Sequence, residues 1–278
     1  MKIGPPGDHR NREGGALIYP VYSRRSGGLS VGINLFPGRK ICSFDCPYCE
    51  VFPFEENAVF DLGTMKTGLC SCLDSAVEQG LPIRDICFSG SGEPSMSPHF
   101  VEALEAARRI RDERAGQSKL VLITNGTGLL NPALFEFLKT RAERGLRIWI
   151  KLDGATESWY KIINRPDIVH GNLVSCIRDF ALSGAPFTLQ TMVCRVKGAL
   201  PPPEEEDTWI ALVTELAEMG RKGEKGGLEA VQIYGKARPA PEDPLAEAAE
   251  GAVLEKRAER LRAALKEKGL ALTVEVFP

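Results

Sequence analysis

Short apolar runs alternate with longer segments of helical periodicity along most of this 278-residue chain. Such alternation is typical of repeated βα units, in which successive strands run parallel. Most of the expected strands are continuous apolar runs, as strands buried on both faces are. The pattern predicts an α/β fold of six βα units and a terminal strand, closed only part way into a TIM-like (β/α)6 barrel. The expected strands are 32–36, 83–89, 120–124, 148–152, 187–193, 230–234 and 272–276, and the expected helices are 63–79, 98–115, 132–144, 168–183, 206–221 and 245–269.

The length and composition fit a single domain. With 278 residues, of which 43% are hydrophobic, the chain can bury one large core. We expect one domain over 1–278, with an N-terminal arm over 1–28 and the barrel, including the last helix and strand, over 29–278. No apolar run approaches the roughly 20 residues of a membrane helix, and the N-terminus lacks the apolar region of a secretory signal, so we expect a cytoplasmic protein. The net charge of −2 argues against nucleic-acid binding through overall basicity.

Several helix boundaries are predicted from capping residues. Ser97-Pro98 and Asn131-Pro132 each offer an N-cap residue followed by proline at the first helical position. The triple proline 201–203 is expected to form a stiff loop before an acidic first turn, which suits the helix dipole. The last expected helix carries an apolar stripe that should pack on the sheet, formed by Leu254, Ala258, Leu261 and Leu265.

Three cysteines, Cys42, Cys46 and Cys49, lie on one short segment directly after the first expected strand. Active sites of α/β barrels gather on the loops at the carboxyl ends of strands. Thiolates favour zinc or iron–sulfur clusters, and a structural zinc site usually has four protein ligands, whereas this segment supplies three. Three thiolates would leave one metal position open to a substrate or cofactor. The alternatives are a zinc site completed by a distant His or Cys, or three buried cysteines without metal.

The other five cysteines show no such spacing. Cys70 and Cys72 are two residues apart in an expected helix, so their side chains point in different directions. Cys87, Cys176 and Cys194 lie among apolar residues and are expected in the core. We therefore expect no second cluster, and reduced thiols rather than a disulfide framework.

The segment Gly90-Ser91-Gly92-Glu93, followed by proline, comes directly after the second expected strand. Two glycines allow a close approach between the backbone and a ligand, and a carboxylate can accept hydrogen bonds from an ammonium group. The segment is therefore a candidate binding loop. An ordinary βα loop without a ligand is the alternative.

Polar residues also mark the next two expected strands. Thr124 and Asn125 end the third, where they can hydrogen-bond a ligand or only shape the turn. In the fourth, Lys151 and Asp153 share one side of the strand. Charged residues in an apolar strand need a polar site or each other. A ligand contact and a structural interaction between Lys151 and Asp153 are therefore both open.

Further polar residues are weaker candidates. Lys236 and Arg238 follow the sixth expected strand and could place two cations at the mouth of the barrel. The basic segment 19–26, which contains two tyrosines and two arginines, could bind phosphate and stack bases, or be a solvated arm. The candidates for the barrel lumen are Gln190, Thr191, Gln232 and Tyr234.

The cysteine spacing, with Tyr48 directly before the last cysteine, resembles the radical S-adenosylmethionine (SAM) superfamily. The mark of this superfamily is Cys-x3-Cys-x2-Cys with an aromatic residue before the last cysteine. The resemblance implies that Cys42, Cys46 and Cys49 hold a 4Fe-4S cluster in a partial barrel of the radical SAM type. It further implies that SAM chelates the fourth iron through its amino and carboxylate groups, with Tyr48 near the adenine.

The same resemblance implies roles for the later motifs. A Gly-Gly-Glu element after the second strand binds the SAM amino group in this superfamily, and here Ser91 stands at its first glycine position. Lys151 and Asp153 are implied to contact the SAM ribose or the substrate. The implied cofactor contacts are Tyr48, Gly90, Ser91, Gly92, Glu93, Thr124, Asn125, Lys151 and Asp153, and the candidate catalytic residues are Lys151, Asp153, Gln190 and Tyr234.

Ser-Arg-Arg-Ser at 23–26 and Gly-x-Gly-Glu-Pro at 90–94 are typical of a bacterial radical SAM group similar to the radical SAM part of wyosine-type tRNA-modifying enzymes. The implied reaction is reductive cleavage of SAM to a 5'-deoxyadenosyl radical, which abstracts hydrogen from an unidentified substrate. A low-potential donor such as flavodoxin or a ferredoxin-like protein would supply the electron. tRNA is one candidate substrate, but wyosine synthases carry further cysteines ahead of the cluster motif, and this chain has none before Cys42. A non-catalytic iron–sulfur or zinc-binding protein is the alternative of another class.

Overall fold

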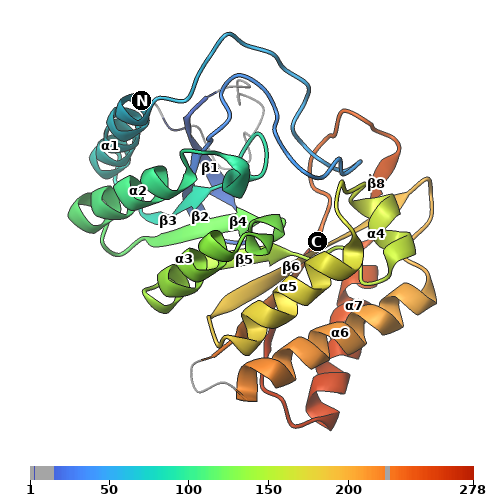
Figure 1. Ribbon diagram of the computed structural model, residues 1–278. Helices are drawn as coiled ribbons and strands as arrows, with labels where there is room; N and C mark the ends of the chain where they lie inside the picture. Colours follow the sequence, from blue (N-terminus) through green and yellow to red (C-terminus); the bar gives the residue numbers. More distant parts are fainter. Residues whose placement is uncertain (1–2, 4–15, 223–225) are drawn as a thin grey trace. The chain divides into compact units, whose positions relative to one another are not determined.

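The computed structural model describes residues 3, 16–222 and 226–278, and the chain forms two compact units (Figure 1). The first unit comprises Met1–Cys42, Val51–Thr124 and Gly145–Arg147, and the second comprises Ser43–Glu50, Asn125–Arg144 and Ile148–Pro278. Half of the expected N-terminal arm, at 1–2 and 4–15, lies outside the described residues. The expected single domain over 1–278 stays a prediction.

The first unit is built from β2 (Gly28–Ile33), β3 (Ile83–Phe88) and β4 (Lys119–Thr124), which pair in parallel in this order. Strand β1 (Ile18–Ser23) pairs antiparallel with β2. Helices α1 (Leu62–Glu78) and α2 (Phe100–Arg114) lie side by side (Figure 1), and a short 3-10 helix, η1 (Pro94–Met96), precedes α2. The parallel pairing follows from the apolar runs, whose side chains are largely buried.

Strand β1 lies within the segment 1–28 that was expected as an N-terminal arm. Pro20 disrupts the strand pattern in the sequence, but β1 is the end strand of its sheet, where the missing N–H of proline breaks no ladder bond. The ring of Tyr19 lies over Gly32, at which a Cβ atom would come within 2.1 Å of that ring. The absence of a side chain at Gly32 therefore allows the two strands to pack.

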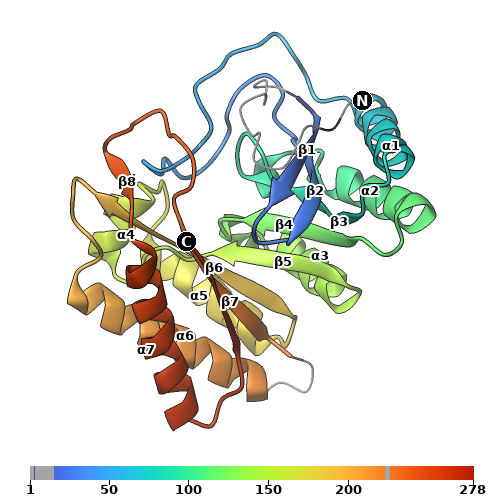
Figure 2. The ribbon, with the colours of Figure 1, turned by 180° about the vertical axis from the view of Figure 1, so that it is seen from behind.

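The second unit contains β6 (Phe187–Val196), β7 (Leu228–Gly235) and β9 (Thr273–Phe277), which are parallel, with β5 (Leu146–Lys151) on the other side of β6. The first two residues of β5 belong to the first unit. Strand β8 (Ala246–Ala248) pairs antiparallel with β6. The helices are α3 (Pro132–Glu143), α4 (Glu157–Ile163), α5 (His170–Leu182), α6 (Pro203–Lys222) and α7 (Gly251–Glu267), and η2 (Thr127–Leu130) precedes α3. Helix α6 packs against α5 and against α7 (Figures 1 and 2).

The capping predictions divide into one success and one failure. Asn131 caps α3, because its Oδ1 accepts hydrogen bonds from the backbone N–H of Ala133 at 2.9 Å and of Leu134 at 3.2 Å. Ser97 does not begin α2, which starts only at Phe100. Ser97 instead ends η1, a turn that the sequence pattern did not reveal.

The predicted stripe of the last helix is confirmed, since all four of its residues are buried in α7. The helix begins at Gly251 rather than at 245, because 246–248 pairs with β6 as β8. Within the described ranges, no helix is both long and apolar enough to cross a membrane.

Candidate functional site

The three predicted cluster ligands lie on the segment that links β2 to α1. Cys42 belongs to the first unit, and Cys46 and Cys49 belong to the second. All three are thiols outside any disulfide and are of intermediate exposure. Across 3, 16–222 and 226–278, no three His, Cys, Asp or Glu side chains meet as a metal-binding group, so convergence of the thiols on one metal stays a prediction. Three thiols on one segment are nevertheless a donor set that fits a 4Fe-4S cluster with three protein ligands.

The residue before Cys42 is docked on the predicted Gly-x-Gly-Glu segment. The backbone N–H of Ile41 donates to the carbonyl oxygen of Ser91 at 3.2 Å, and the Ile41 carbonyl accepts from the N–H of Glu93 at 2.8 Å. Gly92 has a φ of +147°, and a Cβ atom there would lie 2.0 Å from the Ile41 carbonyl oxygen. Only glycine permits this approach. Gly92 therefore holds the start of the cysteine segment in place.

Gly90 and Ser91 lie beside Asn34, which directly follows β2. Asn34 Oδ1 accepts hydrogen bonds from the N–H of Ser91 at 3.2 Å and from the N–H of Phe36 at 3.0 Å. A Cβ atom on Gly90 would lie 3.0 Å from Asn34 Cβ. Asn34 was not singled out from the sequence, although it joins the end of β2 to the Gly-x-Gly-Glu segment.

Glu93 is a buried carboxylate at the N-cap of η1, on the loop after β3, with 3% of its surface exposed. Its Oε1 accepts hydrogen bonds from Ser95 N–H at 3.1 Å, from Ser95 Oγ at 2.6 Å and from Thr124 Oγ1 at 2.7 Å. The structure thus brings together two predicted site residues, Glu93 from the loop after β3 and Thr124 from the end of β4. A buried carboxylate held by three donors is oriented before any ligand arrives.

Asn125, in the second unit, binds the residue that follows Cys42. Its Nδ2 donates to Ser43 Oγ at 2.9 Å. Its Oδ1 accepts from the N–H and from the Oγ1 of Thr127, at 3.0 and 2.8 Å. Asn125 therefore shapes the turn before η2 and also contacts the cysteine segment.

Tyr48, Lys151 and Asp153 form one hydrogen-bonded network. The Tyr48 hydroxyl donates to Asp153 Oδ2, and Lys151 Nζ donates to the same hydroxyl at 2.8 Å. Lys151 Nζ lies 3.8 Å from Asp153 Oδ2. Asp153 also accepts from Asn164 Nδ2 and from the N–H of Met192, both at 2.8 Å. The structural interaction between Lys151 and Asp153 is thus present, and it includes the tyrosine of the cysteine motif.

The protonation of this network follows from its burial. Burial raises the pKa of the Tyr48 phenol, and the neighbouring Asp153 carboxylate raises that pKa further. The hydroxyl therefore stays protonated and donates. Burial also raises the pKa of the Cys46 thiol, while the positive charge of Lys151 acts in the opposite direction.

The second half of the cysteine segment is anchored to the turn between α4 and α5. Asn164 Nδ2 lies 3.5 Å from Cys46 Sγ, and the Asn164 carbonyl accepts from the N–H of Asp45 at 3.0 Å. The carbonyl of Ser43 accepts from the N–H of Asp167 at 3.0 Å. These backbone and side-chain bonds determine the path of the loop on both sides of Cys46.

The two cations predicted for the mouth of the barrel are both paired. Lys236 Nζ lies 2.8 Å from the carboxylate of Asp243. Arg238 lies 2.7 Å from Glu50, the residue after Cys49. Arg238 therefore holds the end of the cysteine segment rather than standing open to a ligand.

Four polar residues form a row across β5, β6, β7 and β9. Strand pairing places Lys151 beside Gln190, Gln190 beside Gln232, and Gln232 beside Glu275. Gln190 Nε2 donates to Gln232 Oε1 at 2.7 Å, and Gln232 Nε2 donates to Glu275 Oε2 at 3.0 Å. Tyr234 lies two residues beyond Gln232, and its ring centroid is 5.9 Å from Lys151 Nζ. The predicted residues Lys151, Gln190, Gln232 and Tyr234 therefore share one face of the sheet.

Thr191 does not share that face, which corrects its prediction as a lumen residue. Its Oγ1 accepts a hydrogen bond at 3.1 Å from Nε1 of Trp209, a residue of helix α6. Consecutive side chains of a strand point to opposite faces, so Gln190 and Thr191 could not both face the lumen.

Helix α4 supplies residues that the sequence analysis missed. Trp159 packs in a buried cluster that includes Tyr48 and Tyr234, with Cys46 against it. The Trp159 indole N–H and the Tyr160 hydroxyl are buried without a hydrogen-bond partner in the described structure. A seven-residue helix spans too few turns to show periodicity, so no signal in the sequence pointed to it.

Glu205, in the acidic first turn of α6, supports the loop that follows Asp153. It is fully buried, and its two carboxylate oxygens accept from the N–H of Ala155 at 2.6 Å and from the N–H and Oγ1 of Thr156 at 2.7 and 2.6 Å. The sequence predicted acidic residues here for the helix dipole only. The side chain instead anchors the loop between β5 and α4, about 50 residues earlier in the chain.

Glu205→Gln is expected to lower the free energy of unfolding by about 2 kcal/mol, because the new amide N–H would face the backbone N–H groups that now bind a carboxylate. Glu204→Gln, on the exposed side of the same turn, is the matched control and should change stability little. Urea denaturation of both variants checks this. Equal midpoints for the two variants would contradict the anchoring role.

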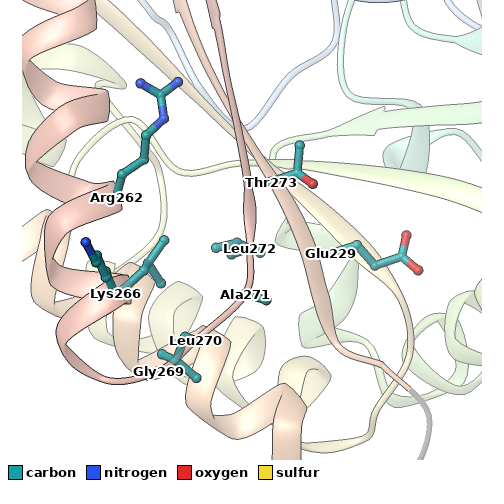
Figure 3. Close-up of a pocket in the computed structure, with 9 residues that line it drawn as sticks. Glu229, Arg262, Lys266, Gly269, Leu270, Ala271, Leu272 and Thr273 are labelled. Atoms are coloured by element: carbon teal, nitrogen blue, oxygen red, sulfur yellow. The ribbon is translucent and has the colours of Figure 1, made fainter.

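A cavity of about 630 Å³ in the second unit lies away from these residues (Figure 3). Arg262 and Lys266 of α7 line it, together with Glu229 and Thr273 at the amino ends of β7 and β9. The predicted site residues of these strands lie toward the carboxyl ends. The cavity is therefore not part of the candidate site.

Among known proteins, no family model matches the chain. It is similar to a curated UPF0026 protein of Helicobacter pylori, with 31% identity over 124 residues, covering 43% of this chain and 38% of the relative. A UPF0026 protein of Synechocystis sp. is 32% identical over 157 residues, covering 54% of this chain and 53% of the relative. The matches therefore span about half the length of these curated relatives or less.

Solved structures share the fold at low sequence identity. Streptococcus suis SuiB bound to the precursor peptide SuiA matches 91% of this chain and 50% of its own, with a TM-score of 0.64 and 13% identity. The structure of anSMEcpe with bound AdoMet and a peptide matches 88% of this chain and 62% of its own, with a TM-score of 0.56 and 13% identity. TYW1 with a lysine-pyruvate adduct matches 84% of this chain and 73% of its own, with a TM-score of 0.53 and 14% identity. These proteins are radical SAM enzymes, so the predicted α/β fold of the radical SAM partial-barrel type is confirmed.

Proposed function

We propose that this chain is a radical SAM enzyme in which Cys42, Cys46 and Cys49 hold a 4Fe-4S cluster and S-adenosylmethionine is reductively cleaved. When bound, the cluster supplies an electron that splits a carbon–sulfur bond of SAM, leaving methionine and a 5'-deoxyadenosyl radical that abstracts hydrogen from a substrate. The fold shared with SuiB and anSMEcpe, structures of which hold S-adenosylmethionine, supports the proposal.

The observation that carries the proposal is the attachment of the cysteine segment to two polar elements. Ile41, just before Cys42, is paired with the segment that ends in Glu93. Tyr48, just before Cys49, is hydrogen-bonded to the Lys151 and Asp153 pair. A zinc site needs no such elements, whereas a site for a zwitterionic nucleoside such as SAM needs polar groups of both charges.

The chain's own residues then bind and orient. Glu93, held by Ser95 and Thr124, offers a buried carboxylate to the SAM ammonium group. Lys151 and Asp153 keep the Tyr48 side chain in one position, and they remain candidates for contact with the ribose or the substrate. Gln190 and Tyr234 share the face of Lys151 and are the further catalytic candidates.

A wyosine-type tRNA-modifying activity is a second candidate. The fold match to TYW1 favours it, while the lack of a cysteine before Cys42 counts against a second cluster. We also propose a flavodoxin or ferredoxin-like electron donor and a cytoplasmic location. The eight cysteines, all outside any disulfide, support a reducing compartment.

Anaerobic reconstitution with iron and sulfide tests the ligand assignment. The unaltered protein should bind iron and sulfide in equal amounts and absorb visible light, and the Cys42→Ala, Cys46→Ala and Cys49→Ala variants should lose most of both. Cys70→Ala is the matched control, since Cys70 has similar intermediate exposure but lies in α1. Full iron loading in the three variants, or bound zinc without sulfide in the unaltered protein, would contradict the assignment and favour a metal-binding protein of another class.

A further inference from the structure

Asn164 places an amide N–H group beside the sulfur of Cys46. Its Nδ2 lies 3.5 Å from Cys46 Sγ, a normal distance for a hydrogen bond to sulfur, and it also donates to Asp153 Oδ2 at 2.8 Å. An amide carries two N–H donors, so both bonds can be made at once. The bond to Asp153 fixes the amide orientation and leaves its second hydrogen directed to the sulfur.

Trp159 places a second N–H in the same region. The residue is 4% exposed, and its indole N–H is fully buried with no acceptor in the described part of the chain. It packs in the buried cluster that contains Tyr48, with Cys46 against that cluster. A buried donor without a partner costs about 1–3 kcal/mol, so such a group in a folded protein calls for a missing acceptor.

The chemistry of that acceptor follows from the surroundings. The aliphatic members of the cluster offer no acceptor, and the hydroxyls of Tyr48 and Tyr234 are already engaged with Lys151. A ligated thiolate or a cluster sulfide, by contrast, accepts hydrogen bonds from N–H groups. Resting on the proposed function, we infer that Asn164 and Trp159 donate hydrogen bonds to the sulfur of the 4Fe-4S cluster on its Cys46 side and raise its reduction potential.

The expected change in the reduction potential has an electrostatic cause, which also gives its direction. Reduction adds negative charge to the cluster, and N–H dipoles directed at sulfur stabilise that charge. Removal of either donor makes the cluster harder to reduce. The midpoint potential therefore moves to more negative values, whereas a loss of packing alone has no fixed direction.

The test uses Trp159→Phe and Asn164→Leu in the reconstituted full chain. Trp209→Phe is the matched control, because this residue of helix α6 has an indole N–H that already donates to Thr191. Midpoint potentials are measured by redox titration followed by EPR of the reduced cluster. Resonance Raman spectra in H2O and in D2O report hydrogen bonds to sulfur directly. Both variants should titrate at a more negative potential and show a smaller deuterium shift of the Fe–S stretching bands, and Trp209→Phe should do neither.

Unchanged midpoints and deuterium shifts in both variants, with the cluster intact, would overturn the inference while leaving the proposed function standing. Failure of the unaltered protein to assemble a cluster would overturn the proposed function and this inference with it. If Asn164→Leu does not fold, because Asp153 also loses a partner, Trp159→Phe decides alone, since it keeps an aromatic ring in the cluster.

Discussion

The Gly92→Ala variant is expected to unfold about 3 kcal/mol more easily than the unaltered protein and to lose most of its iron on reconstitution. The added Cβ would lie 2.0 Å from the Ile41 carbonyl oxygen and 2.8 Å from the ring of Phe36, at a φ that disfavours any side chain. Because backbone cannot give way as a flexible side chain can, Ile41 must shift and Cys42 must move with it. Urea denaturation and iron analysis of the same preparation measure both effects.

Gly80→Ala separates the clash from the backbone strain. Gly80 also has a positive φ, of +66°, but a Cβ atom there meets nothing within 4 Å. This control variant should lower the free energy of unfolding by only about 1 kcal/mol and should load iron normally. If the two variants unfold alike and both retain iron, the docking of Ile41 on Gly92 does not position the cysteine segment.

Asp153→Ala is expected to lower the free energy of unfolding by about 3 kcal/mol. The Asp153 side chain is fully buried, and its removal leaves the Tyr48 hydroxyl, the Asn164 amide and the Met192 N–H without their acceptor. The loss also leaves the Lys151 ammonium without its nearby carboxylate. Thermal and denaturant unfolding of the apoprotein measure the change without any cofactor.

Two further variants refine this result. Asp153→Asn keeps a carbonyl oxygen for the Met192 N–H, so it should lower the free energy of unfolding by less than Asp153→Ala does. Asp179→Ala removes the same side chain from an exposed position of α5, and its free energy of unfolding should stay within about 0.5 kcal/mol of that of the unaltered protein. Equal stability of Asp153→Ala and Asp179→Ala would refute a structural role for the network.

The regular elements could be predicted because burial determines them locally. The apolar runs at β3, β4 and β7 mark strands covered on both faces, and the stripe in α7 marks one buried helix face. The elements that were missed are short or irregular. Strand β8 has three residues and depends on its pairing with β6, and β1 contains a proline that only an end strand tolerates.

The candidate site was predicted as far as its chemistry lies in consecutive residues. Tyr48, Glu93 and Asp153 each belong to a short pattern, whereas their partners do not. Asn164 contacts Cys46 across 118 residues, and Glu205 binds Ala155 across 50. Asparagine in a turn and glutamate in a first helical turn already have local explanations. Only the folded chain reveals that these two side chains serve the loops around the site.

The proposed reaction is tested most directly by the products of SAM cleavage. The anaerobically reconstituted protein is reduced with dithionite in the presence of S-adenosylmethionine, and 5'-deoxyadenosine and methionine are quantified by chromatography. The account predicts that both form in equal amounts with the unaltered protein and with Cys70→Ala, and that neither forms with Cys46→Ala. Absence of 5'-deoxyadenosine from a protein whose reduced cluster is intact and whose SAM remains unconsumed would contradict the account.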